Sequence, residues 1–362
     1  MAVYKHNPNP NRFVRTMRHI YNPIGFQKGY NFILFFIFGG ALLGFCLARA
    51  SYMNVNQNFI PAAGPGESYW YKQDWYNIGI HIHLLTCIPA GLLAPFQFLP
   101  VIRHKLLLFH RLNGYLIILL ILITNIGALM IARRAFSGTL ATQSGVGLLA
   151  ILTTTSTILA YINIKRLQIE QHRAWMLRTW SYMGTIITTR IIMIISTQII
   201  TRIGSYYIAM PCKQIEAMGG DIEHYLTCSA SEEAWTVVHA DFAATNGIQE
   251  IAATFQLTFG MSIWLSIALH AVGVELYLHL TKAETERLRR VSYERQVERG
   301  MRRPGSAGLT TDRFGDEEEW VPPVKKVAGT MGDEDKLGVN VVDDDSSSGI
   351  SKPPSALGWD RS

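Results

Sequence analysis

The sequence of 362 residues is 49% hydrophobic and only 17% charged, with a formal net charge of +6 and a mean hydropathy of +0.15. Soluble chains carry roughly a quarter charged residues, and here nearly all charges lie in the first 30 residues, the last 80 and short connections. The positive charge is therefore explained by basic loops, and no nucleic-acid surface is expected. The sequence also lacks a P-loop, a dinucleotide glycine motif, a serine-nucleophile elbow and a His-Glu-x-x-His zinc motif, which gives hydrolysis and nucleotide-driven transport little support.

The first part of the chain does not have the pattern of a cleavable signal peptide. Residues 1–30 are polar and basic, and the first apolar stretch begins only near Asn31. That stretch starts too late and runs too long for the apolar region of a signal peptide. We interpret residues 1–30 as a cytosolic N-terminal segment.

Six apolar stretches of about 20 residues follow, the length that a helix needs to cross a bilayer. Because lipid cannot satisfy exposed backbone polar groups, each stretch must be helical. The sequence therefore predicts an all-α, polytopic membrane helix bundle over residues 31–280. Its six transmembrane helices are expected at residues 31–50, 77–100, 113–132, 143–164, 175–202 and 250–280.

Lysine and arginine residues predict the orientation of the bundle. They gather before the first span, in the 101–112 and 164–174 connections, and after the last span. These four segments fall on one face of a six-helix bundle, and basic loops are typical of the cytosolic side. Arg133 and Arg134 are the exception, on a short opposite loop. We expect the N and C termini to be cytosolic.

The opposite face then carries the loops at 51–76, 133–142 and 203–249. Cys212 and Cys228 share the last of these loops, where an oxidising compartment would allow a disulfide. The alternative is two unpaired thiols. Cys46 and Cys87 lie inside apolar spans and are interpreted as small hydrophobic residues.

Two segments follow the last span. Residues 281–303 mix glutamate and arginine at helical spacing, which predicts a basic juxtamembrane helix near anionic headgroups. Residues 304–362 are acidic and rich in serine, proline and glycine. Such a composition cannot build a core, so we expect a disordered acidic C-terminal tail.

Ionisable residues inside a span are the strongest functional signals in a membrane protein, because each is costly unless it is paired or hydrated. Arg190 lies mid-span and must face the bundle interior. Glu250, at the start of the last span, is the expected partner, and Asp241 is the second choice. A structural ion pair and a site for an anionic substrate are both open.

The histidines form the second signal. His81 and His83 stand two positions apart on a helix, so at most one of them faces the core. His110 and His172 each open a helix on the cytosolic face and are each followed by an arginine. Two such imidazoles on facing helices have the geometry of a bis-histidine haem site, with His270 as an alternative ligand and His81 as a further candidate. Interfacial anchoring is the alternative reading, and no other metal is expected because carboxylates and cysteines are absent at ligand spacing.

Milder polar residues lie near the span ends. Gln97 stands between Pro95 and Pro100, which predicts a kinked helix whose freed carbonyls need donors such as Arg111 or Arg178. Glu275, in the last span, is a further candidate acid.

The segments that contain these residues resemble a known family. His81 through Pro95-Phe-Gln-Phe-Leu-Pro100 to His110-Arg-Leu-Asn-Gly-Tyr115 form one half of the resemblance, and Gln171-His-Arg-Ala-Trp-Met-Leu-Arg178 with Arg190 form the other. Together they are similar to the predicted membrane protein family known as domain of unknown function 2306, in its fungal form, over roughly residues 20–280. The resemblance implies a set of characteristic polar positions, namely His81, His110, Arg111, His172, Arg173, Arg178 and Arg190. It implies no reaction.

Three functions remain open from the sequence. The first is a redox or electron-transfer protein with a histidine-ligated haem. The second is a membrane-embedded biosynthetic enzyme of the cyclase or isomerase type, in which Arg190 and an acid such as Glu250 act on a lipophilic secondary metabolite. The third is a non-catalytic membrane component. The expected partners are the lipid bilayer and a lipophilic small molecule, and the expected location is the endomembrane system or the plasma membrane.

Overall fold

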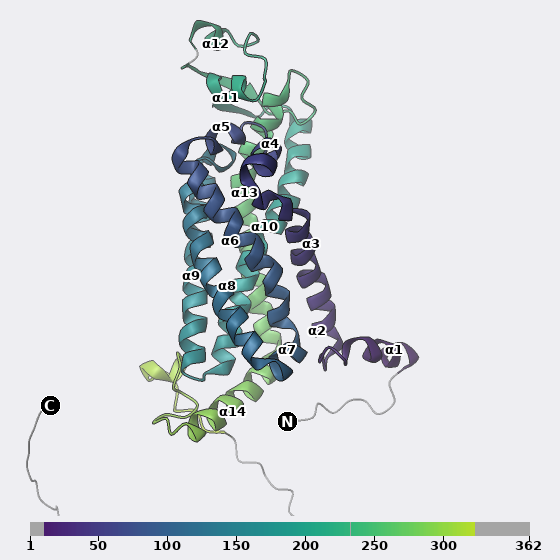
Figure 1. Ribbon diagram of the computed structural model, residues 1–362, viewed down its shortest axis with the longest axis vertical. Helices are drawn as coiled ribbons and strands as arrows, with labels where there is room; N and C mark the ends of the chain where they lie inside the picture. Colours follow the sequence, from purple (N-terminus) through teal and green to yellow (C-terminus); the bar gives the residue numbers. More distant parts are fainter. Residues whose placement is uncertain (1–10, 232, 323–362) are drawn as a thin grey trace, which may run out of the picture. The chain divides into compact units, whose positions relative to one another are not determined.

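The computed structural model describes residues 11–231 and 233–322 of the chain. Its compact unit extends to Val321, and Figure 1 shows it as a bundle of long helices. Six helices among these described residues are long and apolar enough to span a membrane, which confirms the predicted number. They cover Gly29–Ala48 (α2, Gly29–Leu34, a π-helical turn at Phe35–Gly39, and α3, Gly40–Ala48), α6 (Asp74–Phe98), α8 (Leu107–Ile131), α9 (Leu140–Lys165), α10 (Ile169–Ile203) and α13 (Ile248–Leu280).

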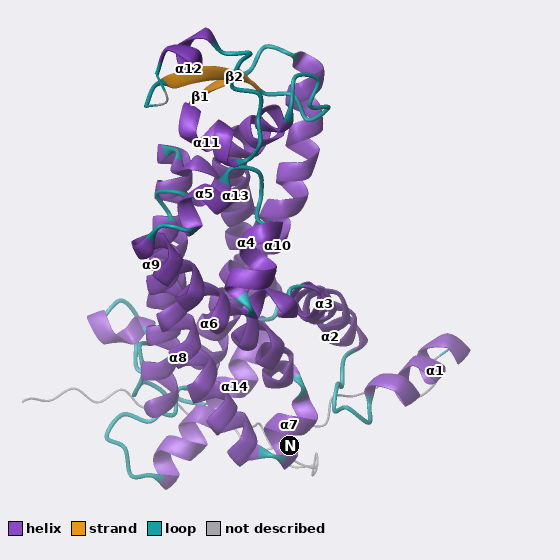
Figure 2. Ribbon diagram, turned by 45° about the horizontal axis from the view of Figure 1, so that its top comes forward, coloured by secondary structure: helices purple, strands orange, loops and turns teal. Residues whose placement is uncertain are grey.

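Shorter elements connect and flank these spans. They are α1 (Arg12–Tyr21), α4 (Ile60–Ala62), α5 (Glu67–Tyr71), α7 (Pro100–Lys105), β1 (Tyr207–Pro211), α11 (Cys212–Ala217), α12 (Leu226–Ala230), β2 (Trp235–His239) and α14 (Lys282–Glu298), with 3-10 turns at Ala50–Met53, Ala135–Gly138 and Thr311–Phe314 and a π-helical turn at Val55–Phe59. The strands β1 and β2 pair antiparallel, with Ala209 opposite Val237. Figure 2 shows this small sheet lying over the ends of the helices.

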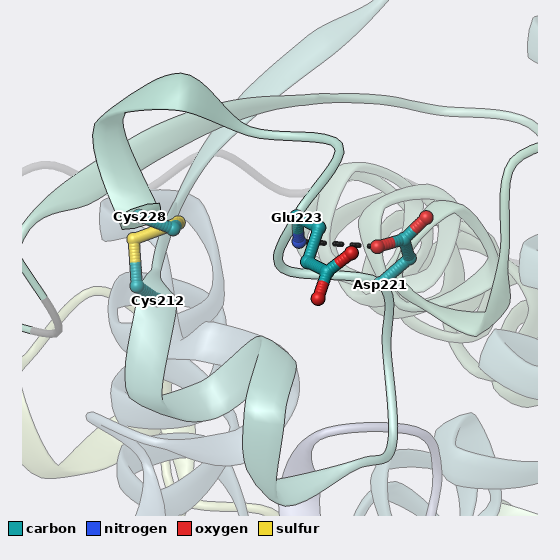
Figure 3. Close-up of a disulfide and its surroundings, with 4 residues drawn as sticks. All are labelled: Cys212, Asp221, Glu223 and Cys228. Atoms are coloured by element: carbon teal, nitrogen blue, oxygen red, sulfur yellow. Dashed lines mark hydrogen bonds between the residues drawn. A yellow bond between two sulfur atoms is a disulfide. The ribbon is translucent and has the colours of Figure 1, made fainter. Parts of the chain in front are cut away.

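The two ends of the bundle differ in what covers them. We call the end with residues 49–73, 132–139 and 204–247 the disulfide end, and the end with residues 99–106, 166–168 and 281–321 the basic end. At the disulfide end, Cys212 and Cys228 form a disulfide that joins α11 to α12 (Figure 3). The Asp221 carboxylate accepts the backbone N–H of Glu223 at 3.1 Å and shapes the loop between the two cysteines.

Small and hydroxylated residues allow the helices to pack closely. A Cβ atom on Gly127 of α8 would lie 2.6 Å from the backbone nitrogen of His83 on α6. Thr179 of α10 donates to Ser156 of α9 at 2.9 Å. Small residues at helix contacts and hydroxyl hydrogen bonds between helices are typical of membrane proteins. In lipid, burial of apolar surface does not drive helices together, so close packing and hydrogen bonds must do so. Large apolar side chains such as Phe36, Leu269 and Val272 are exposed on the outside, as a lipid-facing surface requires.

The basic end is closed by a buried hydrogen-bond network that we call the latch, made of Asn163, Gln168, Glu170, Ser292 and Gln296. The Ser292 hydroxyl donates to Glu170 at 2.6 Å, and the Gln296 amide donates to Gln168 at 2.9 Å. Each of the five side chains is at most 1% exposed.

The latch also holds the chain that follows α14. Gly305 N–H donates to Gln296 at 2.6 Å, and Leu309 N–H donates to Asn163 at 2.8 Å. The prediction began the disordered tail at residue 304, whereas residues 305–309 are held by these contacts. Side-chain amides of the latch bind the backbone of this segment, and its own polar composition gives no sign of that. The remainder of the predicted tail, residues 323–362, lies outside the described residues.

Candidate functional site

Arg190 lies in the middle of α10 and contacts two aromatic rings. Its guanidinium carbon is 4.9 Å from the ring centroid of Phe136 and 5.3 Å from that of Phe259. A guanidinium over a ring face gains cation–π attraction. Among the residues that the structure describes, the Arg190 side chain has no hydrogen bond and no ion pair, so its donors are left for another group.

The predicted partner, Glu250, does not pair with Arg190. Its carboxylate accepts the backbone and side-chain N–H groups of Asn246 at 2.8 and 2.9 Å and lies 3.6 Å from His239. Helix geometry explains the correction. Arg190 lies about 20 Å below the end of α10, whereas Glu250 lies about 3 Å from the start of the antiparallel α13. A carboxylate in a first helical turn is also stabilised by the helix dipole.

Asp241, the second choice, is also engaged elsewhere. It accepts the backbone N–H of Ala243 at 2.8 Å and the Thr245 hydroxyl at 2.7 Å. The hydrogen bond from Thr245 lowers the pKa of the Asp241 carboxyl. Asp241 therefore stays ionised and shapes the turn before α13.

Glu67 of α5 is the carboxylate whose charge acts on Arg190 among the described residues, and the Phe136 residue that contacts Arg190 also binds it. Glu67 is 7% exposed and accepts the Tyr71 hydroxyl at 3.0 Å and the Phe136 backbone N–H at 3.2 Å. Burial raises the pKa of the Glu67 carboxyl above its usual 4.5, and burial followed by the Glu67 charge raises that of Tyr71 well above 10.0. A buried carboxyl with a raised pKa is suited to hold and donate a proton.

A strained turn brings these groups together. Phe136 and Ser137 have φ angles of +46° and +62°, in a region that side chains with a Cβ rarely adopt. The turn places the Phe136 ring 4.5 Å from that of Phe259, beneath Arg190, and points the Phe136 N–H at Glu67. Strain of this kind persists where surrounding contacts hold it and is frequent at functional sites.

The histidine that faces the core is His83. Its Nδ1 atom lies 3.1 Å from the Thr124 hydroxyl on α8 and within electrostatic reach of Arg190. His81, the candidate of the sequence, instead hydrogen-bonds the Asn77 carbonyl of its own helix at 2.8 Å. The cluster of Arg190, Glu67, Tyr71, His83, Phe136 and Phe259 is the candidate functional site.

His110 and His172 lie at the opposite end of the bundle, so His81 does not share a site with them. His172 Nδ1 is 2.9 Å from the Ala160 carbonyl, and His110 Nδ1 is buried without a hydrogen-bond partner in the described chain. The two imidazoles are within electrostatic reach of each other and of Arg103. The Gln97 side-chain amide donates to the His110 carbonyl at 3.2 Å and so connects α6 to α8 near His110.

The remaining predicted polar residues connect α10 to α13. His270 bonds the Ser181 carbonyl through Nδ1 at 2.6 Å and the Thr188 hydroxyl through Nε2 at 2.8 Å, which leaves neither ring nitrogen for a ligand. Arg178 forms a bidentate ion pair with Glu275 at 2.6 and 2.9 Å.

Of the other two arginines, Arg173 donates to Thr281 at 3.1 Å, and Arg111 is exposed. Within residues 11–231 and 233–322, no group of three or more histidine, cysteine or acidic side chains could hold a metal ion.

Sequence reasoning missed Glu67, Tyr71 and Phe136. Glu67 stands in a loop of aromatic and turn residues that suggests an interfacial belt, and nothing in its spacing links it to Arg190. One usable signal was an acidic residue within an otherwise apolar and aromatic loop on the face opposite the basic loops.

Comparison with known proteins agrees with the membrane assignment. Residues 80–212 match the family described as "Predicted membrane protein (DUF2306)", which confirms the resemblance over that range. The "Ava biosynthesis cluster protein G" of Aspergillus versicolor is 23% identical over 309 residues, covering 70% of this chain and 90% of that protein. No solved structure matches the chain. The protein is an integral, multi-pass membrane protein.

Proposed function

We propose that the protein is a membrane-embedded enzyme of secondary metabolism that isomerises or cyclises a lipophilic small molecule at the Arg190–Glu67 cluster. The observation that carries the proposal is a buried carboxyl, Glu67, and a mid-span guanidinium, Arg190, that both contact Phe136; the pKa of the carboxyl is raised, and the donors of the guanidinium are unused within the described chain. The similarity to a protein named for a biosynthesis cluster supports the metabolic setting. The bilayer supports the lipophilic substrate, because the site lies among membrane-spanning helices.

The chemistry needs no additional reactant. The Glu67 carboxyl donates its proton to the substrate, a bond of the substrate shifts or a ring closes, and a proton returns from the product to the Glu67 carboxylate. Arg190 binds and orients a carbonyl or acidic group of the substrate. Phe136 and Phe259 supply apolar walls, and Tyr71 fixes the Glu67 carboxyl.

The direct test is metabolite profiling of a producing strain in which the gene is replaced by variants. Because isomerisation and ring closure conserve mass, loss of the gene should accumulate a compound of the same mass as the product and a different retention time. Glu67→Gln should reduce product formation about 10²–10⁴-fold, as expected for loss of a general acid. Arg190→Met should reduce it by about 10²-fold or more.

Matched controls are Glu275→Gln and Arg178→Met, which make the same chemical changes in an ion pair away from the cluster. They should retain product formation within about twofold. Normal product formation by folded Glu67→Gln and Arg190→Met proteins would refute the proposal and favour a non-catalytic membrane component.

The pH profile is a second readout of the Glu67 role. A general acid acts only while protonated, and burial raises the pKa of Glu67. Activity in membrane vesicles should therefore be present at low pH and fall as the pH rises through that raised pKa. A profile that rises with pH would assign Glu67 the role of a base instead.

A histidine-ligated haem for electron transfer is the second candidate function. The bond of His172 Nδ1 to the Ala160 carbonyl resembles the outer contact that orients a metal-bound imidazole, and His110 lies within electrostatic reach. His172 and His110 would hold the group, which would supply one-electron chemistry. The absorption spectrum of protein expressed with haem supplementation decides the matter, because absence of a Soret band removes this candidate.

We further propose that the basic end faces the cytosol. The basic residues of that end and the disulfide at the other support this orientation. An N-glycosylation acceptor made by Ala243→Asn, at the disulfide end, should be modified, whereas one made by Ala283→Asn should not. The reverse pattern would invert the topology.

A further inference from the structure

The first helix of the described chain, α1, carries opposite chemistry on its two sides. Its apolar side chains fall within an arc of about 120° around the helix axis, and its polar side chains fill the remainder. The apolar arc holds Phe13, Val14, Met17, Ile20 and Tyr21, and the polar arc holds Arg12, Arg15, Thr16, Arg18 and His19. The helix contains no aspartate or glutamate, so every charge on its polar arc is positive.

The apolar arc of α1 faces the first membrane span. Tyr21, at the end of this arc, is buried, and its ring centroid lies 5.9 Å from that of Phe32 in α2. The Phe32 ring centroid in turn lies 6.3 Å from that of Phe36, whose side chain is 70% exposed on the lipid-facing surface. The apolar arc is therefore continuous with the surface that the first span presents to lipid.

The turn between α1 and the first span is held against α7. The Ile24 carbonyl accepts the backbone N–H of Val101 at 3.2 Å. Gly25 has a φ of +93°, and a Cβ there would lie 2.9 Å from the Val101 nitrogen, so only glycine allows this approach. Figure 1 shows α1 lying crosswise to the first span and pointing away from the bundle. This is the direction of a helix that lies along a membrane surface instead of across it.

Two large apolar side chains of α1 lie open at the surface. Phe13 is 70% exposed and Ile20 is 52% exposed. Contiguous exposed apolar side chains mark membrane or protein contacts. Lipid is the occupant favoured here, because the arc continues into the lipid-facing surface at Phe36. A second copy of α1 is disfavoured, since it would bring arginines of two helices together with no acid on either helix to pair with them.

We propose that α1 lies in the membrane interface at the basic end and binds anionic phospholipids of the adjacent leaflet. Its apolar arc enters the boundary of the acyl chains, and Arg12, Arg15 and Arg18 contact the anionic headgroups. No residue of α1 belongs to the candidate functional site, so this contact is independent of the Glu67 chemistry.

The test compares the full-length protein, one copy in each nanodisc, in phosphatidylcholine alone and in phosphatidylcholine mixed with phosphatidylserine. The readout is hydrogen exchange of the α1 amides, because a helix held at the interface opens less often than a free one. Exchange should be about tenfold slower in the discs with phosphatidylserine, and this difference should shrink as the salt concentration rises.

Charge variants assign the effect to the polar arc. Each arginine near an anionic surface contributes about fivefold, so Arg12→Gln combined with Arg15→Gln should remove most of the phosphatidylserine effect. The matched control is Arg133→Gln combined with Arg202→Gln, which removes two exposed arginines toward the other end of the bundle. The control should leave exchange of the α1 amides unchanged.

A second pair of variants tests the apolar arc. Phe13→Ser removes an exposed ring and exchanges residues of similar helix propensity. It should speed exchange of the α1 amides about fivefold in both lipid mixtures, because the ring no longer enters the acyl boundary. Thr16→Ser, on the polar arc, should behave like wild type. Exchange of the spanning helices should be the same in all variants, which shows that the bundle is folded.

Two results would overturn the proposal. Equal exchange of α1 in both lipid mixtures would show that anionic lipid does not bind it. Protection that appears only in nanodiscs with two copies of the chain would assign the apolar arc to a second copy. Neither result bears on the Glu67 variants, whose readout is product formation.

Discussion

At the basic end, five buried polar side chains of the latch satisfy one another and the backbone of residues 305–309. At the disulfide end, Trp70, Arg134 and Gln214 each keep one buried polar atom unpaired within the described structure. A saturated network gains stability and a unique geometry, whereas unpaired groups cost stability. The latch is therefore the rigid part of the basic end, which outside the latch also holds buried unpaired polar atoms, on Arg289, Ser306, Thr310 and Asp312 within the described structure.

The disulfide is a covalent constraint on the end that carries it. Cys212 and Cys228 are 16 residues apart in sequence, and closing a loop of that length contributes about 3 kcal/mol. Cys212→Ser combined with Cys228→Ser should therefore loosen residues 204–247, measured as faster amide hydrogen exchange there.

The latch is the internal control of that experiment. Exchange at residues 163–170 and 292–309 should stay unchanged in the double variant, because among the described residues no hydrogen bond of the latch reaches the disulfide loop. If amide exchange became equally faster at both ends, the two ends would unfold as one unit, and the contrast between them would be wrong.

A smaller effect is expected from the latch itself. Gln296→Leu leaves the Gly305 N–H, the Arg166 carbonyl and Gln168 Oε1 short of a partner. The substitution should lower the free energy of local opening at the latch by about 2 kcal/mol, measured by hydrogen exchange of the Gly305 and Leu309 amides. Glu294→Leu, on the exposed side of the same helix, should change it by less than about 0.5 kcal/mol.

The smallest effect concerns the strained turn after α8. Ser137 has a φ of +62°, which glycine adopts without steric cost. Ser137→Gly should therefore stabilise the folded protein by about 0.5 kcal/mol, measured by thermal unfolding in detergent. Ser144→Gly, in the regular part of α9, should destabilise it by a similar amount. Loss of stability at Ser137 would mean that its side-chain contacts outweigh the backbone strain.

Part of the candidate site followed from the sequence. Arg190 stands out because a guanidinium inside an apolar span is costly wherever the helix packs. Its partner could not be found in this way. Glu250 was the acid expected at a compatible depth, but Arg190 lies 13 residues before the end of α10 and Glu250 only two residues after the start of α13, so their depths differ. Glu67 reaches the region through an irregular loop whose path no periodicity encodes.

The histidines show the same limit. The spacing of His81 and His83 established that only one faces the core, yet the choice of His83 depends on Thr124 of the neighbouring helix. Likewise, the acidic composition after residue 303 predicts a solvated tail, but the contacts of Gly305 and Leu309 with latch amides decide that the chain folds back first.

The sequence by itself determined that this protein lies in a lipid bilayer and how many helices cross it. Runs of about 20 apolar residues must be helices in lipid, and that requirement depends on composition alone. The tertiary structure decided which polar groups meet, because those contacts join helices and loops far apart in the chain. The proximity of Arg190 to Phe136, the neighbour of Glu67, and the paired latch both arise from that packing.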